Sequence, residues 1–464
     1  MLGAPELRLG AVASPEAVAV AGCAAALVLA LLVRRPPKQA HKRGTLIEAH
    51  CSRRMRAWLA ALWGESAALT LAGTVVPACD ETKHFKLIGT TGTGKSTAIR
   101  ELLRGALARG DRAVITDPDG GYCGEFFDRH RGDVILNPFE RHSVCWDPFA
   151  EIRSAYDVEQ LASGLIPETE DANSREWRGY ARTFLAAVTR RCHERGLCGA
   201  AELWRLVTMA SSEELRPIVA RTPAQPFLES DNARMFCSIR SVAGSVIAAL
   251  EYIQEQRATG FSVRDWVAEG RGVLFIPYRA AQISALRSII ATWMRLAIFE
   301  AMSRPEGDQR LWFVVDELDA LGAIDGLKDA LARLRKFGGR CVLGFQSIAQ
   351  VSSTYGAGEA QTIVENCGNT LILRCSGSEN GGTSQFASRL IGEREVLWRQ
   401  TSWSRDGGWG GPNGRRTRQV TEQHTTELAV LASELEQLPD LHGYLKTASS
   451  RGWTRVALAP RGAR

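Results

Sequence analysis

The chain has 464 residues, of which 45% are hydrophobic and 23% charged, with a formal net charge of +6. This composition supports a large buried core and excludes a mostly disordered or collagen-like protein. The 11 cysteines show no paired CxxC spacing, which argues against a structural zinc site or a disulfide framework and fits a reducing cytosol.

The N-terminal region combines an apolar run with a basic segment. Residues 17–33 carry no charged side chain and reach the lower length limit for a membrane-spanning helix. Residues 34–56 carry eight Lys or Arg and one acid, while residues 57–464 are formally neutral, so the basic excess lies beside the apolar run. By the positive-inside rule the following chain is cytoplasmic. We predict one transmembrane helix within an anchor of residues 1–56; a signal peptide or a buried helix is the alternative.

Residues 84–107 predict a nucleotide-binding strand, loop and helix. The apolar run Phe85–Ile88 precedes GTTGTGKS, which matches the pattern G-x4-G-K-[ST]. Small residues let the loop curl so that its N–H groups face phosphate oxygens, and the helix adds its positive end. We expect ATP and Mg²⁺, with Lys95 on the phosphates and Ser96 on the metal. The expected nucleotide-binding residues are Gly89, Thr90, Thr91, Gly92, Thr93, Gly94, Lys95, Ser96 and Thr97.

An acidic pair supplies the second motif that such a site needs. Asp316 and Glu317 directly follow the apolar run of residues 311–315, and no other apolar run ends this way. We expect Asp316 in the Mg²⁺ shell and Glu317 as the general base that polarises the attacking water. No N/T-K-x-D base reader of a GTP switch is present, so ATP hydrolysis is the expected reaction.

The remaining apolar runs predict an α/β fold with a mostly parallel sheet. Helical patterns separate many of these runs, and ligands of such sheets bind at the carboxyl ends of the strands. Long helical patterns over residues 155–262 predict an all-α domain inserted between two parts of a nucleotide-binding domain, residues 57–154 and 263–464; crossover helices on the sheet are the alternative. Strands are expected at 113–117, 133–136, 273–277, 311–316, 341–345, 370–374 and 453–458.

Residues 401–418 are rich in glycine and arginine and contain Trp403 and Trp409. The simplest interpretation is a solvated flexible loop. The alternative is a segment that contacts single-stranded nucleic acid through arginine and stacked aromatic side chains.

Several stretches together resemble the type IV coupling proteins of conjugation systems. The phosphate loop alone is widespread, but its occurrence in order with GFQSIAQ and NCGNTLILR is specific, and the likeness covers nearly everything from about residue 70 onward. The stretches are ETKHFKLIGTTGTGKST (81–97), RGDRAVITDPDGGY (109–122), RGDVILNPF (131–139), LWFVVDELDALG (311–322), LRKFGGRCVLGFQSIAQVSSTYG (334–356), NCGNTLILRCSG (366–377) and ELEQLPDLHGYLK (434–446).

The resemblance implies a RecA-like P-loop NTPase that forms a homo-hexamer in the bacterial inner membrane. It implies delivery of DNA, single-stranded and with an attached relaxase, into a type IV secretion channel, with the inserted helices receiving the substrate complex. Family members usually have two transmembrane helices, and this sequence shows one. The alternatives are an ATP-binding receptor for protein cargo and a related translocase of double-stranded DNA.

The resemblance also implies roles for individual residues. Gln346 is expected to sense the γ-phosphate, and Arg374 is the candidate arginine finger that reaches a neighbouring subunit's nucleotide. A strand-end salt bridge is the alternative for Arg374. Asp117 and Asp119 are expected to shape the rim of the pocket, and a simple turn explains them equally well.

Overall fold

The computed structural model describes residues 39–48, 69–168, 171–197, 199–254, 260–379, 381–405 and 416–460. The chain forms two compact units. The smaller contains the described residues up to Gly44 together with Glu393–Glu427, and the larger contains the remainder. The transmembrane helix predicted at residues 17–33 lies outside the described residues. Within the described ranges, no helix is both long and apolar enough to cross a bilayer.

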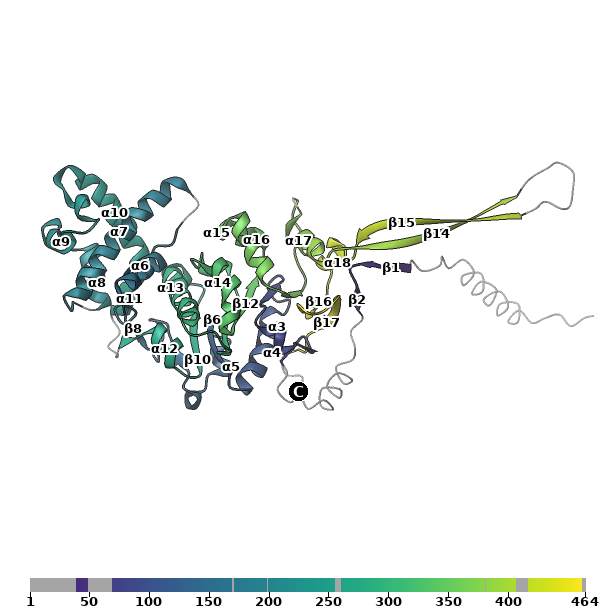
Figure 1. Ribbon diagram of the computed structural model, residues 1–464, viewed down its shortest axis with the longest axis horizontal. Helices are drawn as coiled ribbons and strands as arrows, with labels where there is room; N and C mark the ends of the chain where they lie inside the picture. The colour runs from purple at the N-terminus through teal and green to yellow at the C-terminus, as the bar shows by residue number, and fades with distance from the viewer. Residues whose placement is uncertain are drawn as a thin grey trace, which may run out of the picture. The chain divides into compact units, whose positions relative to one another are not determined.

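A ten-stranded sheet forms the centre of the larger unit, in the order β2-β17-β16-β13-β5-β12-β11-β6-β10-β7 (Figure 1). The strands from β13 to β7 run parallel, β16 is antiparallel to both of its neighbours, β13 and β17, and β17 pairs in parallel with β2. Every predicted strand overlaps an observed one. The bounds are β2 Ile47–Glu48, β5 Phe85–Ile88, β6 Arg112–Pro118, β7 Val134–Ile135, β10 Val273–Tyr278, β11 Leu311–Val315, β12 Gly339–Phe345, β13 Asn369–Ile372, β16 His442–Lys446 and β17 Trp453–Ala457.

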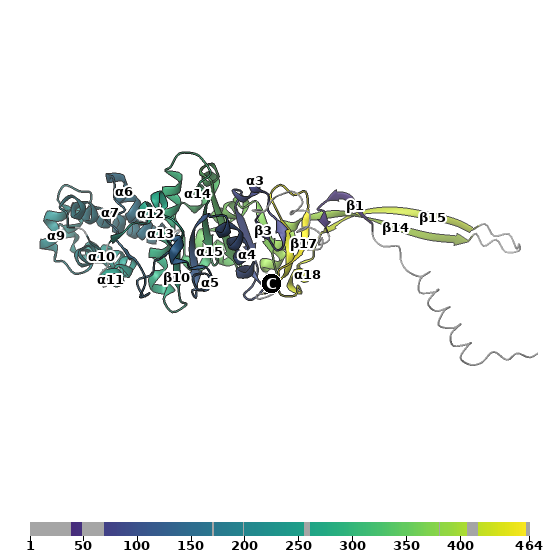
Figure 2. The same cartoon turned by 90° about the horizontal axis from the view of Figure 1, so that it is seen from below.

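Helices cover both faces of this sheet, which therefore has a hydrophobic core on each side (Figure 2). Trp312 and Val314 of β11 belong to the core beneath α4, whereas Phe313 and Val315 belong to the core shared with α13, α14 and α16. Burial on both faces explains the continuous apolar runs of the strands. The bounds are α3 Ala78–Glu81, α4 Lys95–Ala108, α5 Cys123–Phe126, α12 Val263–Glu269, α13 Ile283–Met302, α14 Leu327–Leu334, α15 Ile348–Tyr355, α16 Ala357–Asn366, α17 Gly382–Ile391 and α18 Ala432–Glu436.

The stretch predicted as all-α, residues 155–262, is helical in the structure up to Gln254, but the prediction is wrong at its end, where Gly260 and Phe261 form a strand. Its described residues between 155 and 254 contain helices and no strand, and β9 (Gly260–Phe261) then pairs with β8 (Cys145–Trp146). Side chains cap three of the helices at their starts, Ser154 before α6, Asp171 before α7 and Ser211 before α9. Its definition as a separate domain stays a prediction. The helices are α6 Ala155–Leu165, α7 Ala172–Glu194, α8 Ala200–Thr208, α9 Ser212–Val219, α10 Ala233–Ile247 and α11 Ala249–Gln254.

The smaller unit is a three-stranded sheet in which β14 (Glu393–Arg405) lies between β1 (Gln39–Gly44) and β15 (Arg416–Leu428). The loop expected over residues 401–418 is therefore wrong at both ends, because residues 401–405 and 416–418 belong to strands. Residues 406–415 lie outside the described part of the chain. The glycine-rich centre dominated the composition of this stretch, whereas its flanks carry the Thr, Val and Trp residues that favour strands.

Candidate active site

The phosphate loop connects β5 to α4 at the carboxyl edge of the sheet. Gly92 and Gly94 have φ angles of +78° and +117°, in the left-handed region that favours glycine. A Cβ atom at Gly94 would also approach the side chains of Leu441 and Leu458 to 2.9 Å. The two glycines thus allow the backbone to curl tightly before α4 begins at Lys95.

Lys95 points back into the curl of this loop. Its ammonium group donates hydrogen bonds to the carbonyl oxygens of Gly89 and Thr90, and its side chain is buried. Burial lowers the pKa of Lys95, while the nearby carboxylates of Asp316 and Glu317 act in the opposite direction. The cation is therefore held where backbone N–H groups and the start of α4 converge, as a phosphate site requires.

Asp316 faces α4 across the site, directly after β11. Its Oδ2 atom accepts a hydrogen bond from the Ser96 hydroxyl at 2.7 Å and another from the Tyr122 hydroxyl at 2.6 Å. Its Oδ1 atom is buried and has no hydrogen-bond partner among the described residues. A hard cation such as Mg²⁺ prefers oxygen ligands of this kind, so the predicted pair of Ser96 and Asp316 fits a magnesium site.

Glu317 and Gln346 lie on the other side of the same hollow, which has a volume of about 170 Å³. Gln346 donates to Glu317 Oε1 at 3.2 Å and accepts a hydrogen bond from the Thr91 hydroxyl at 2.9 Å. Burial, and then the negative charges of Asp316 and Asp319, raise the pKa of Glu317. A chain of side chains thus joins the phosphate loop to a carboxylate with the properties of a general base.

A close backbone contact positions the acidic pair. A Cβ atom at Gly344 of β12 would lie 2.2 Å from the carbonyl oxygen of Asp316. Only glycine permits this approach, so β12 packs directly against the turn that carries Asp316 and Glu317.

Tyr122 is a site residue that the sequence analysis missed. The buried Asp117 accepts hydrogen bonds from the backbone N–H groups of Tyr122 and Cys123, and the Arg100 guanidinium lies 4.9 Å from the centre of the Tyr122 ring. Burial raises the pKa of Asp117 to about 6. Asp117 does not lie at the rim of the pocket: it is buried and organises a turn, which is the alternative given for it. Asp119, with a φ of 59°, belongs to that turn.

Arg374 follows β13 and pairs within its own chain. Its guanidinium lies 2.7 Å from Asp440 Oδ1, and its carbonyl oxygen accepts the Thr90 N–H at 2.9 Å. This is the strand-end salt bridge given as the alternative. A role towards a neighbouring subunit's nucleotide stays a prediction.

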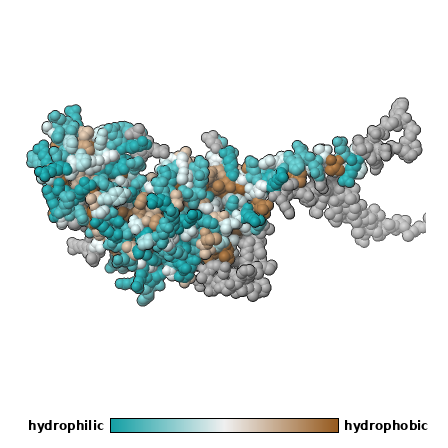
Figure 3. Space-filling model, viewed as in Figure 1, coloured by the Kyte–Doolittle hydropathy of each residue, from teal (hydrophilic) through white to brown (hydrophobic). Residues whose placement is uncertain are grey.

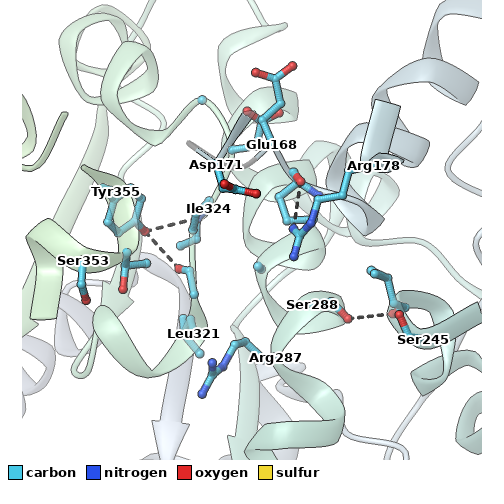
Figure 4. A pocket seen from close by; sticks show the side chains of 18 of the residues that line it. Glu168, Asp171, Arg178, Ser245, Arg287, Ser288, Leu321, Ile324, Ser353 and Tyr355 are labelled. Atoms are coloured by element: carbon cyan, nitrogen blue, oxygen red, sulfur yellow. Dashed lines mark hydrogen bonds between the residues drawn. The ribbon is translucent and has the colours of Figure 1, made fainter. Parts of the chain in front are cut away.

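A larger hollow of about 760 Å³ lies between the helical stretch and the elements that follow the acidic pair (Figure 4). Its walls include the segment of residues 321–326, the end of α15 and part of α13. The Tyr355 hydroxyl accepts a hydrogen bond from the Ile324 N–H and donates one to the Gly322 carbonyl oxygen. No sequence pattern predicted this hollow.

The doubly covered parallel sheet, the phosphate loop and the facing acidic pair define a P-loop nucleotide-binding protein. A family model described as the type IV secretion-system coupling protein DNA-binding domain matches residues 68–459. The chain belongs to this family, and the resemblance found in the sequence is confirmed.

Individual relatives agree with this assignment. Coupling protein TraD of Escherichia coli (strain K12) is 30% identical over 79% of this chain and 51% of its own length. Conjugal transfer protein TraG of Escherichia coli is 23% identical over 74% of this chain and 58% of its own. The chain thus spans about half the length of the curated relatives that it matches over most of its sequence.

Solved structures of the plasmid coupling protein TrwB share the fold. The unbound monoclinic form of TrwBdeltaN70 superimposes with a TM-score of 0.78 at 30% identity, covering 92% of this chain and 95% of that chain. The TrwB complex with ADP and Mg²⁺ gives 0.77 at the same identity and coverage. TrwB has also been solved with the ATP analogue ADPNP. The expected cofactors, ATP and Mg²⁺, agree with these complexes.

Proposed function

We propose that this chain is an ATPase that couples hydrolysis of ATP to delivery of DNA into a type IV secretion channel. The observation that carries the proposal is the hydrogen-bonded chain from Thr91 through Gln346 to Glu317. It connects the loop that would hold the γ-phosphate to the carboxylate that would activate water. A site for nucleotide binding alone does not need that connection.

Each side chain of the site would have its own role in ATP hydrolysis. Ser96 and the free Oδ1 atom of Asp316 would hold Mg²⁺, which when bound neutralises negative charge on the β- and γ-phosphates. Lys95 would exchange its loop carbonyls for phosphate oxygens. Glu317 would orient the attacking water and accept its proton, and its raised pKa makes it a stronger base than an ordinary glutamate. Gln346 would report the presence of the γ-phosphate to Glu317.

The wider assembly belongs to the same proposal. Residues 17–33 would anchor the chain in the bacterial inner membrane, and residues 34–56 would face anionic headgroups. A homo-hexamer would place Arg374 at a neighbouring subunit's nucleotide once its pairing with Asp440 opens. The cargo would be single-stranded DNA with an attached relaxase. The chain's similarity to TrwB and TraD, both coupling proteins, supports this direction.

The test is the ATPase rate of the full chain in detergent, measured with and without single- and double-stranded DNA. Lys95→Ala should lower the rate at least about 100-fold, because it removes a charge that stabilises the transition state. Lys336→Ala, which removes an exposed lysine outside the site, is the matched control and should leave the rate unchanged.

Two results would contradict the proposal. A Lys95→Ala protein with the wild-type rate would overturn the site. An oligomeric wild-type protein whose rate ignores both kinds of DNA would favour an ATP-binding receptor of protein cargo. A response to double-stranded DNA alone would favour the related translocase.

A further inference from the structure

The β14–β15 hairpin segregates its charges along its length. The base, residues 393–398 and 422–428, carries four Glu and one Arg, whereas the distal parts, residues 399–405 and 416–421, carry four Arg and no acid. At the base, Arg394 pairs with Glu427 at 3.1 Å and His424 with Glu395 at 2.8 Å. Acidic side chains thus have partners across the strands at the base, while the sequence of the distal parts carries positive charge alone.

The distal part also exposes large aromatic surface. The side chain of Trp403 is 66% exposed, and the Arg418 guanidinium lies 5.8 Å from the centre of its ring. Val420 and Trp398 are exposed as well. On the side that Figure 3 shows, hydrophilic and hydrophobic residues are mixed along the hairpin. This combination of tryptophan, arginine and scattered apolar residues is typical of the membrane–water interface.

The register of β1 shows which of its ends lies towards the distal part of the hairpin. Gly44 lies opposite Arg394 and Gln39 opposite Leu397, so Gln39 is that end. β14 continues for eight residues beyond Leu397, or roughly 26 Å at about 3.3 Å per residue. Val33, the last residue of the apolar run, precedes Gln39 by six residues, a span of at most about 21 Å. The distance from Gln39, opposite Leu397, to the described end of β14 is therefore at least as great as the largest possible distance from Gln39 to Val33.

We propose that the distal part of the β14–β15 hairpin rests on the anionic lipid surface of the membrane that residues 17–33 enter. Trp403 lies at the level of the headgroups, and Arg418 pairs with lipid phosphates while stacking on its ring. The acidic base stays in water, which sets the depth to which the hairpin approaches the bilayer. The inference rests on the anchoring part of the proposed function and adds a second contact with the membrane.

The experiment uses the full chain labelled with 5-fluorotryptophan and reconstituted in nanodiscs that contain phosphatidylglycerol. The Trp403→Phe variant assigns the ¹⁹F resonance of Trp403. A gadolinium-labelled headgroup lipid should broaden this resonance at least roughly twofold, because the ring lies at the interface. Trp312, buried in β11, is the internal control and should stay sharp. Arg418→Glu should remove the broadening of Trp403, as should replacing phosphatidylglycerol by phosphatidylcholine.

The other outcomes distinguish failure of the hairpin contact from failure of the membrane anchor. If the chain enters the discs while the Trp403 resonance stays sharp, the hairpin contact is overturned and the anchor stands. If the chain does not associate with the discs, both are overturned, while the ATPase test of Lys95 remains independent. If single-stranded DNA shifts the Trp403 resonance and the labelled lipid does not broaden it, the hairpin is a nucleic-acid contact and the lipid proposal fails.

Discussion

The two hollows of the larger unit differ in size and in chemistry. The larger hollow has few converging charged side chains, whereas the smaller one has several. The larger, of about 760 Å³, is lined by side chains that mostly do not converge, such as Arg287 and Glu168 (Figure 4). The smaller, of about 170 Å³, brings Lys95, Asp316 and Glu317 together with backbone N–H groups. Convergence of buried charges marks the place where chemistry occurs better than volume does.

The two hollows nevertheless share their supporting segments. The wall at residues 321–326 begins four residues after Glu317, and Tyr355 ends the helix that starts two residues after Gln346. Substitutions of matched chemistry in the two hollows therefore show whether hydrolysis depends on the smaller one alone.

Of the substitutions that test this comparison, Glu317→Gln should have the largest effect on the rate of ATP hydrolysis. Loss of the general base should lower kcat about 10²–10⁴-fold while nucleotide binding persists, as measured by steady-state hydrolysis and equilibrium binding. The base acts when it is deprotonated, so the wild-type rate should be full at high pH and fall as the pH drops through the pKa of Glu317. Because burial raises that pKa, the fall should begin above the pH at which an ordinary glutamate titrates.

The matched control for Glu317 is Glu359→Gln, which removes the same charge from the larger hollow. We expect it to keep the wild-type rate. An equal loss of kcat in both variants would mean that the two hollows act as one site, and the comparison would be wrong.

Tyr122→Phe should have an intermediate effect. It removes the hydroxyl that donates to Asp316 Oδ2 at 2.6 Å and leaves the ring in place. A hydrogen bond to a charged group contributes about 1.5–3 kcal/mol, so we expect the Mg²⁺ concentration for half-maximal nucleotide binding to rise at least about tenfold. A magnesium titration of binding measures this directly, without turnover.

Tyr278→Phe provides the control for Tyr122. The Tyr278 hydroxyl is buried and has no hydrogen-bond partner among the described residues, so its removal should leave magnesium dependence unchanged. Equal shifts in the two variants would show that the effect of Tyr122 is general packing and not orientation of the metal-binding carboxylate.

The difference between the motif residues and Tyr122 shows what a sequence can predict. Lys95, Ser96 and Asp316 belong to short patterns that end buried strands, and their convergence follows from the parallel sheet. Tyr122 reaches Asp316 across 194 residues of sequence through a turn organised by Asp117, and no local pattern marks that contact. An aromatic residue just after a strand-ending D-x-D-G-G turn was the only available signal.

The fold shows the same division. Strands buried on both faces have continuous apolar runs. Every strand predicted from such a run overlaps a strand of the structure. β14 and β15 belong to a small sheet with few buried residues, so their Thr, Arg and Glu residues gave no clear alternation of apolar and polar positions. The glycine-rich sequence between the two strands led to the prediction of a loop over residues 401–418.

Tyr355→Phe should have the smallest effect on hydrolysis, although it removes a hydroxyl that contacts two backbone groups in the wall of the larger hollow. Without the hydroxyl, the buried Ile324 N–H loses its partner and the Gly322 carbonyl loses a donor, which should lower the free energy of unfolding by about 1–3 kcal/mol. Urea unfolding measures this loss, with Tyr156→Phe, at a side chain that is 68% exposed, as the neutral control. Residues 321–326 begin four residues after Glu317, and the hydrogen bond from Gln346 still orients the Glu317 carboxylate, so the ATPase rate should change less than about threefold, or 0.7 kcal/mol. A hundredfold loss of rate without a loss of stability would place the larger hollow in the catalytic cycle, and volume would then have marked a functional site after all.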